Sequence, residues 1–366
     1  MTNPLRVIIS GGGTGGHIFP AVAIANELRR RLPDTEILFV GANGRMEMTR
    51  VPDAGYKIVG LDISGLQRRL TPQNFMFPVR VFRSVRKAGR LIEEFRPDVV
   101  VGVGGYASAP VLLAATSRAI PSLIQEQNSY AGLVNKLLAR RVGRICVAYD
   151  GMEKFFPKDK IVLTGNPVRT EIADGDRAEA LQFFGLNPDK KTLLVVGGSL
   201  GARTLNLATA AALQRLRDAG VQLLWQTGKL YFPEAERLAG PYQADNLYAL
   251  EFIKRMDLAY AAADVVISRA GALSVSELCL TGKASILVPS PNVAEDHQTK
   301  NALSLVSKGA AVLITDEHAQ ARLYDEALRL LGDTERQQQL STRVRELARP
   351  NATAIIVDEL LRLIKS

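Results

Sequence analysis

The sequence predicts an α/β protein made of two Rossmann-like, doubly wound domains that face a central cleft. The chain has 366 residues, of which 47% are hydrophobic, and this length exceeds the ~150 residues typical of one domain. Strand-like apolar runs alternate with helical patterns along the chain, as in parallel sheets covered by helices. A glycine-rich turn between a strand and a helix occurs near the start and again after residue 196.

Apolar runs mark the predicted strands of both domains. They comprise residues 7–9, 37–40, 99–103, 122–124, 145–148, 192–196, 223–225, 265–268, 285–288 and 311–314. Helical patterns separate them; after the first run, for example, Ala21, Ile24 and Leu28 recur at helical spacing. Ligands of open α/β sheets bind beyond the carboxyl ends of the strands, so the loops after these runs form the candidate site.

The boundary between the domains is expected at the segment that contains Gly165 and Pro167, which interrupts an apolar strand and precedes a polar stretch. We therefore expect a first domain over residues 1–166 and a second over 167–346. The last helical segment, about 347–366, is a candidate to pack back on the first domain.

The charge and cysteine content limit the classes of partner. Lys and Arg number 46 against 37 Asp and Glu, with a pI near 9.6, so an anionic partner is expected, whether nucleic acid, membrane surface or phosphorylated substrate. Cys146 and Cys279 lack metal or disulfide spacing, which fits a reducing cytoplasm.

No apolar run approaches the ~18 residues of a membrane span, and the start is unlike a signal peptide. A soluble or peripheral protein is expected.

The first glycine-rich turn, residues 11–17, is the most informative motif because it ends in His17. Such a turn lets backbone N–H groups approach a phosphate. Pro20 fits the first turn of the following helix, so His17 is expected just before that helix, facing the ligand. An ordinary tight turn is the alternative. A nicotinamide cofactor is disfavoured, because the run 37–40 ends without the acidic residue that holds the ribose.

Two further strand ends of the first domain carry candidate residues. Gly104, Gly105 and Tyr106 follow the run 99–103 and offer more backbone donors to the same anion, although a plain strand end would look similar. The polar residues 125–129 follow the next run, and polar side chains at a strand end are typical of a site.

The second domain has the residues expected of a nucleotide site, including the acidic residue that the first domain lacks. Residues 268–277 end a strand and open a helix, which forms a seat for an anion, and the Glu277 carboxylate is placed to accept ribose hydroxyls. The alternative is that Ser274 and Glu277 form a capping box. Asp174 and Asp176 match an Asp-x-Asp metal motif but lie in a polar helical stretch, so no metal is expected.

A basic segment between residues 63 and 92 has seven basic residues, no acidic one and interleaved aromatic residues. This composition suits the anionic cytoplasmic leaflet of a membrane. A solvated helix with an apolar face toward the core is the alternative, and both can hold at once. No RNA-binding motif accompanies the charge, so no nucleic acid is expected. The predicted membrane residues are Phe75, Phe77, Arg80, Phe82, Arg83 and Arg86.

Seven ordered motifs point to one family. They are GGGTGGHIFP (11–20), GVGGYASAP (102–110), QEQNSYAGLVNKLLA (125–139), GNPVR (165–169), GGSLGA (197–202), SRAGALSVSE (268–277) and DHQTKNA (296–302). With them, essentially the whole chain resembles the N-acetylglucosaminyltransferases of peptidoglycan synthesis, the MurG family.

The resemblance implies a glycosyltransferase of the GT-B fold. It implies inverting transfer of GlcNAc from UDP-GlcNAc to the C4 hydroxyl of MurNAc in undecaprenyl-pyrophosphoryl-MurNAc-pentapeptide, the step from lipid I to lipid II, with no metal and no cofactor. The expected location is peripheral, at the cytoplasmic face of the plasma (inner) membrane. Other proteins of cell-wall synthesis are the implied partners, and cell shape and cell division are the implied processes.

The resemblance also implies roles for individual residues. The donor would contact Thr14, Gly15, Gly16, Asn128, Arg169, Ser199, Ile253, Arg269, Ala272, Leu273, Ser274, Val275, Ser276, Glu277, His297 and Gln298. The pyrophosphate of the acceptor would contact Gly12, Gly13, Gly104, Gly105 and Tyr106. Members of the family often carry two successive glutamines where this chain has His297 and Gln298.

His17 is the candidate catalytic base, because an unperturbed imidazole has a pKa of ~6.5. In the alternative, His17 only orients an oxygen and Glu126 or water accepts the proton. Two rival functions stay open: a UDP-GlcNAc 2-epimerase of similar build, and a non-catalytic scaffold at the membrane surface. The retention of His17, Glu277 and Gln298 argues against the scaffold.

Overall fold

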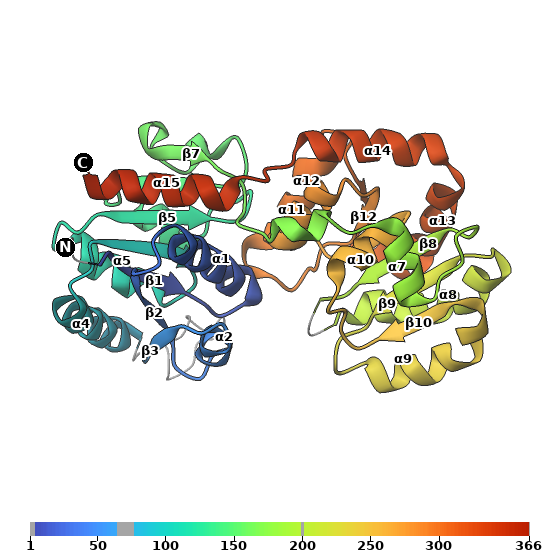
Figure 1. Cartoon of the computed structure of the whole chain (residues 1–366), viewed down its shortest axis with the longest axis horizontal. Helices are drawn as coiled ribbons and strands as arrows, with labels where there is room; N and C mark the ends of the chain where they lie inside the picture. The colour runs from blue at the N-terminus through green and yellow to red at the C-terminus, as the bar shows by residue number, and fades with distance from the viewer. Residues whose placement is uncertain (1–3, 64–76, 199–200, 366) are drawn as a thin grey trace. The chain divides into compact units, whose positions relative to one another are not determined.

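The chain folds into two units, which the computed structural model describes over residues 4–63, 77–198 and 201–365. Unit 1 comprises Met1–Val168 together with Pro350–Ser366, and unit 2 comprises Arg169–Arg349 (Figure 1). Two predicted site residues, Phe75 and Ser199, lie outside the described residues.

Unit 1 contains a seven-stranded sheet in which every pair of neighbours is parallel. Its order is β3-β2-β1-β4-β5-β6-β7. The strands are β1 (Arg6–Gly11), β2 (Glu36–Ala42), β3 (Lys57–Leu61), β4 (Val99–Gly104), β5 (Ser122–Glu126), β6 (Arg144–Val147) and β7 (Ile161–Leu163). The order reverses between β1 and β4, which makes the sheet doubly wound.

Helices cover both faces of this sheet, which explains why its central strands are continuous apolar runs. On one face, Ile24 of α1 and Ile356 of α15 belong to one buried hydrophobic cluster. On the other face, Ile92 of α4 and Leu112 of α5 belong to a second cluster. The helices are α1 (Gly15–Arg31), α2 (Glu47–Asp53), α4 (Phe77–Phe95), α5 (Ser108–Thr116), α6 (Leu133–Leu138) and α15 (Ala352–Lys365).

Unit 2 repeats the arrangement with a six-stranded parallel sheet of order β10-β9-β8-β11-β12-β13. Its strands are β8 (Thr192–Val196), β9 (Gln222–Gln226), β10 (Leu247–Leu250), β11 (Val265–Ser268), β12 (Ser285–Leu287) and β13 (Val312–Leu313). Its helices are α7 (Arg177–Phe184), α8 (Arg203–Asp218), α9 (Phe232–Ala239), α10 (Met256–Ala262), α11 (Ala272–Thr281), α12 (His297–Val306), α13 (Ala319–Gly332) and α14 (Thr334–Glu346). The two Rossmann-like domains predicted from the sequence are thereby confirmed.

Three strands, β3, β7 and β10, were not among the predicted runs. Each lies at the edge of its sheet and is only partly buried at several positions. An edge strand is covered less completely than a central one, so it carries a weaker apolar signal.

The C-terminal helix α15 belongs to unit 1, where it packs beside α1 (Figure 1). Its residues Ile356, Val357 and Leu360 are fully buried, and Arg31 of α1 forms an ion pair of 2.5 Å with Asp358. Among the helices of the described residues, none is both long enough and apolar enough to cross a membrane.

Candidate active site

Two glycine-rich loops meet where the strand order of unit 1 reverses, beyond the carboxyl ends of β1 and β4. The Gly12 N–H donates to the Gly104 carbonyl oxygen at 3.3 Å. Gly105 has φ +86°, and a Cβ atom there would lie 2.4 Å from the Gly12 oxygen. A side chain at position 105 would therefore force the loops apart, and this explains the glycine-rich sequence of both.

His17 lies inside the first turn of α1, and not just before the helix as predicted. The helix begins at Gly15 with Thr14 as its N-cap, so Pro20 falls in the second turn. The His17 Nδ1 atom is 3.0 Å from the Gly12 carbonyl oxygen. Because a carbonyl oxygen only accepts hydrogen bonds, Nδ1 carries the proton, and the lone pair of the neutral ring is on Nε2.

Internal hydrogen bonds use several backbone donors that were predicted to bind the acceptor pyrophosphate. The N–H of Gly12 bonds to Gly104, that of Gly13 donates to Glu47 Oε2 at 2.8 Å, and that of Gly104 donates to Ser108 Oγ at 3.1 Å. Within the described part of the chain, the N–H groups of Thr14, Gly15, Gly16 and Gly105 make no such bond. The anion-binding capacity of these loops is thus concentrated at the start of α1.

Glu126, the alternative proton acceptor, is 2% exposed at the end of β5. Its Oε1 accepts from the Asn128 N–H at 3.1 Å, and its Oε2 accepts from the Gly132 N–H at 3.0 Å and from Asn135 Nδ2 at 2.8 Å. Burial raises the pKa of Glu126 while these donors oppose the rise. The carboxyl group therefore holds the loop that carries Asn128. Tyr106, which follows β4, is 51% exposed.

In unit 2 the strand order reverses between β8 and β11, and α11 begins directly beyond β11. Gly271 is its N-cap, and no side chain caps the helix. Glu277 accepts a hydrogen bond from Tyr260 instead, so the alternative capping box of Ser274 and Glu277 is wrong. Leu273 and Ser274 then leave their first-turn N–H groups without a bond among the described residues, as an anion seat requires.

Glu277 has the most informative electrostatic environment of unit 2. Its Oε2 accepts from the hydroxyl of Tyr260 at 3.1 Å, and Tyr260 itself is 1% exposed. Burial raises the pKa of Glu277 to about 7, against the lowering effects of the Tyr260 hydrogen bond and the Arg169 charge. Arg169, the first residue of unit 2, thus lies near enough to Glu277 to lower its pKa.

The remaining predicted donor residues line the ends of other elements of unit 2. Arg269 donates through Nη1 to the carbonyl oxygens of Val288 and Pro289 and to Asp316. This nitrogen therefore forms hydrogen bonds within unit 2. Gln298 Oε1 accepts from the Ser290 N–H at 2.9 Å, which directs its amide nitrogen elsewhere.

His297 is the first residue of α12, directly before Gln298. Ile253 follows β10 and is buried, with 3% of the residue exposed. Val275 is buried and Ser276 donates to the Ala272 carbonyl oxygen at 3.0 Å. The side chains of Ala272 and Val275 thus pack inside unit 2, and that of Ser276 bonds to the backbone of α11.

Sequence reasoning missed three buried polar residues that position the site: Glu47, Asn135 and Tyr260. Each is at most 3% exposed, and each bonds to a loop or side chain of the predicted site. Tyr260 is spaced like a core aromatic residue of α10, and Glu47 follows no strand run. Only the presence of Asn135 inside the QEQNSYAGLVNKLLA motif offered a signal.

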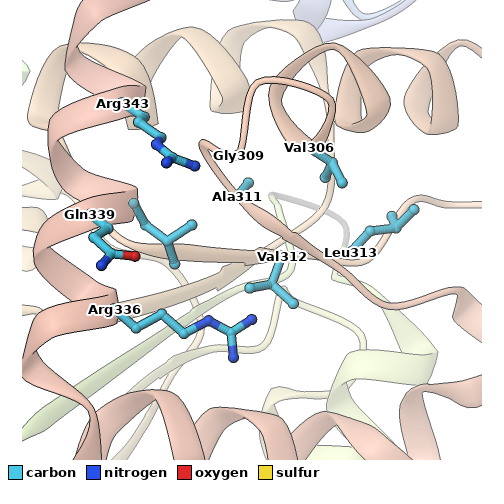
Figure 2. Close-up of a pocket in the computed structure, with 9 residues that line it drawn as sticks. Val306, Gly309, Ala311, Val312, Leu313, Arg336, Gln339 and Arg343 are labelled. Carbon is cyan, nitrogen blue, oxygen red and sulfur yellow. The ribbon is translucent and has the colours of Figure 1, made fainter.

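A separate hollow of about 380 Å³ lies between α14 and β13 of unit 2. Figure 2 shows Arg336 and Arg343 of α14 reaching toward β13 and the preceding turn. None of its lining residues was singled out by the sequence motifs. The described residues contain no group of three or more His, Cys, Asp or Glu side chains that could hold a metal ion.

Family models match both halves of the chain. The glycosyltransferase family 28 N-terminal domain matches residues 7–147, and the glycosyltransferase family 28 C-terminal domain matches residues 192–354. The two matches contain, respectively, the glycine-rich loop with His17 and the helix with Glu277.

Individual proteins are similar over nearly the full length. The UDP-N-acetylglucosamine–N-acetylmuramyl-(pentapeptide) pyrophosphoryl-undecaprenol N-acetylglucosamine transferase of Parabacteroides distasonis is 57% identical over 98% of both chains. The crystal structure of Acinetobacter baumannii MurG has a TM-score of 0.81 and 30% identity, over 98% of this chain and 100% of that one. A UDP-N-acetylglucosamine 2-epimerase shares the fold at 17% identity, with a TM-score of 0.64 over 99% of this chain and 96% of that one. The chain belongs to glycosyltransferase family 28, and within it to the MurG group of N-acetylglucosamine transferases.

Proposed function

We propose that the protein transfers GlcNAc from UDP-GlcNAc to the C4 hydroxyl of MurNAc in undecaprenyl-pyrophosphoryl-MurNAc-pentapeptide, the step from lipid I to lipid II of peptidoglycan synthesis. The observation that carries the proposal is the 57% identity to a transferase of this name over 98% of both chains. Each unit is proposed to contribute one part that such a transfer needs: unit 1 a base, and unit 2 a binding site for a nucleotide diphosphate.

His17 is the proposed base. The acceptor hydroxyl must lose its proton as it attacks the anomeric carbon. The hydrogen bond from Nδ1 to the Gly12 carbonyl oxygen at 3.0 Å leaves Nε2 as the basic nitrogen. Glu126 is proposed as a positioning residue for Asn128 rather than as the proton acceptor, since both of its oxygens already accept bonds from its own loop.

The pyrophosphate of the acceptor is proposed to bind at the start of α1. The N–H groups of Thr14, Gly15 and Gly16, which make no hydrogen bond among the described residues, and the positive end of the helix dipole favour an anion there. Gly12, Gly13 and Gly104 shape the loops, while Gly105 and Tyr106 border them. Thr14 to Gly16 are also the proposed contacts of the incoming GlcNAc.

UDP-GlcNAc is proposed to bind to unit 2. The first turn of α11, with Leu273 and Ser274, would receive the diphosphate, and Glu277 would accept the ribose hydroxyls. Arg169 would add positive charge at the leaving UDP. Gln298, whose amide oxygen accepts from the Ser290 N–H, would donate to a sugar hydroxyl, and His297 and Ile253 would complete the contacts.

The reaction is proposed to need no metal and no cofactor, because helix α11 and Arg169 can stabilise the charge of the departing UDP. Activity that survives EDTA would support this, and activity restored only by a divalent cation would contradict it.

We also propose that the protein binds the cytoplasmic face of the plasma membrane through α4. Phe82 is 67% exposed and Val79 44% exposed on this helix, and Arg83 and Arg86 lie exposed beside them. The opposite face packs on the sheet through Ala88 and Ile92. The exposed face thus combines apolar and basic side chains, which anionic lipids attract. Proteins of cell-wall synthesis are the proposed partners there.

An assay with UDP-GlcNAc and a lipid-linked muramyl acceptor tests the function. We expect UDP release only when the acceptor is present, together with a disaccharide-lipid product. Conversion of UDP-GlcNAc alone into its manno isomer would identify an epimerase instead. No turnover under either condition would contradict both enzymatic functions.

A further inference from the structure

Glu47 is a buried acidic residue for which the proposed mechanism has no role. It is the first residue of α2 and is 1% exposed. Its Oε1 accepts from the Ala42 N–H at 3.0 Å, and its Oε2 accepts from the Gly13 N–H at 2.8 Å. Buried carboxylates are rare unless they are paired or strongly hydrogen-bonded, so this one needs an explanation.

The surrounding backbone is shaped to admit this side chain. A Cβ atom at Gly12 would lie 2.2 Å from Glu47 Cδ, and one at Gly41 would lie 2.5 Å from Glu47 Cγ. Any residue other than glycine at positions 12 or 41 would therefore displace the carboxylate. Gly13, whose N–H it accepts, has φ +88°, a conformation that favours glycine.

The peptide unit that joins Gly12 and Gly13 connects Glu47 to His17. On one side of this unit, the Gly13 N–H donates to Glu47 Oε2 at 2.8 Å. On the other side, the Gly12 carbonyl oxygen accepts from His17 Nδ1 at 3.0 Å. A negative charge on the N–H side polarises the peptide and makes its carbonyl oxygen a stronger acceptor.

We propose that Glu47 is a positioning residue that acts on His17 through the Gly12–Gly13 peptide, fixing the ring with its proton on Nδ1 and its lone pair on Nε2. The arrangement parallels a carboxylate that orients a catalytic histidine, with one peptide unit inserted between them. Gly104 closes the other side, since a Cβ atom there would lie 2.9 Å from His17 Nε2. The inference rests on the proposed role of His17 as the base.

Glu47→Gln tests the relay, because the amide nitrogen of glutamine cannot accept a hydrogen bond and the charge is removed. We expect kcat to fall about tenfold, as for loss of a hydrogen bond to a charged group, while the KM for UDP-GlcNAc stays within twofold. Glu36→Gln is the matched control: Glu36 is exposed, pairs with Arg6 at 3.2 Å, and lies at the start of β2, whereas Ala42 ends that strand. An unchanged kcat in folded Glu47→Gln protein would overturn the proposal.

Side-chain ¹⁵N NMR of histidine supplies a readout that does not depend on activity. The chain has only three histidines, so a His17→Gln variant assigns the signal of interest. At pH 8 the wild type should show His17 protonated on Nδ1, and Glu47→Gln should weaken this preference. A wild-type ring protonated on Nε2, or the same tautomer in both proteins, would overturn the relay. Absence of transferase activity in the wild type would instead contradict the proposed function.

Discussion

Replacing Glu277 by glutamine is expected to stabilise the protein while weakening donor binding. The pKa of Glu277 rises from 4.5 to about 7 chiefly because the group is buried, and each pKa unit corresponds to about 1.4 kcal/mol. The full rise would correspond to about 3 kcal/mol. Because the side chain keeps some exposure to solvent, water screens part of this energy, and we expect about 2 kcal/mol.

The sign of the effect depends on pH. The folded-state pKa of Glu277 lies above the unfolded value, so the folded protein holds a proton that the unfolded chain releases between pH 4.5 and 7. The contribution of Glu277 to stability is therefore fully present below pH 4.5 and is lost as the pH rises through about 7. Glutamine does not titrate, so the advantage of Glu277→Gln should be absent near pH 4.5 and complete at pH 8.

Thermal unfolding measures this directly. In a unit of this size, about 2 kcal/mol corresponds to a rise in Tm of about 4–8 °C, expected at pH 8 and not near pH 4.5. Calorimetric titration with UDP at pH 8 should show weaker binding of Glu277→Gln, because an amide replaces the proposed acceptor of both ribose hydroxyls. Glu236→Gln, an exposed substitution on α9, should change neither quantity. An equal gain in Tm at both pH values would refute the reasoning.

Three further predictions concern unit 1. His17→Ala should lower kcat by about 10²–10⁴, the usual contribution of general base catalysis, with little change in the KM for UDP-GlcNAc; an unchanged kcat in a steady-state assay would exclude the base role. Asn135→Ala removes the donor at 2.8 Å from Glu126 Oε2, so it should lower the free energy of unfolding in urea by about 1–3 kcal/mol, and a loss below measurement error would show that water replaces the amide. Replacing Phe77 and Phe82 by Ser should weaken sedimentation with anionic vesicles but spare activity on a soluble acceptor analogue; equal sedimentation would contradict the membrane role of α4.

The fold could be predicted because its signals are local. Each buried parallel strand is a short apolar run, and the glycine-rich turns occur where the backbone has little room, as at Gly105 against the Gly12 oxygen. The edge strands β3, β7 and β10 gave weaker signals because one side of each is less covered. The start of α1 was placed too late, since Pro20 fits several positions near a helix start whereas Thr14 is the actual N-cap.

The site could be predicted only where its residues share a motif. Glu277 was identified from its distance to a strand end, but its partner Tyr260 lies 17 residues away in sequence and is spaced like a core residue. Glu47 lies 34 residues from the Gly13 N–H that it accepts. Such contacts depend on how the strands are ordered in the sheet, which no local pattern encodes.

The return of α15 to unit 1 has a consequence for synthesis on the ribosome. Unit 1 needs Pro350–Ser366 to be complete, whereas unit 2 is one continuous stretch, Arg169–Arg349. Until the end of the chain emerges, the surface of unit 1 that receives Ile356, Val357 and Leu360 stays uncovered. Although domains usually mature in the order in which they are made, here the unit translated second is the first that can close its core. A nascent chain stopped before residue 350 would therefore carry a finished unit 2 beside an unfinished unit 1.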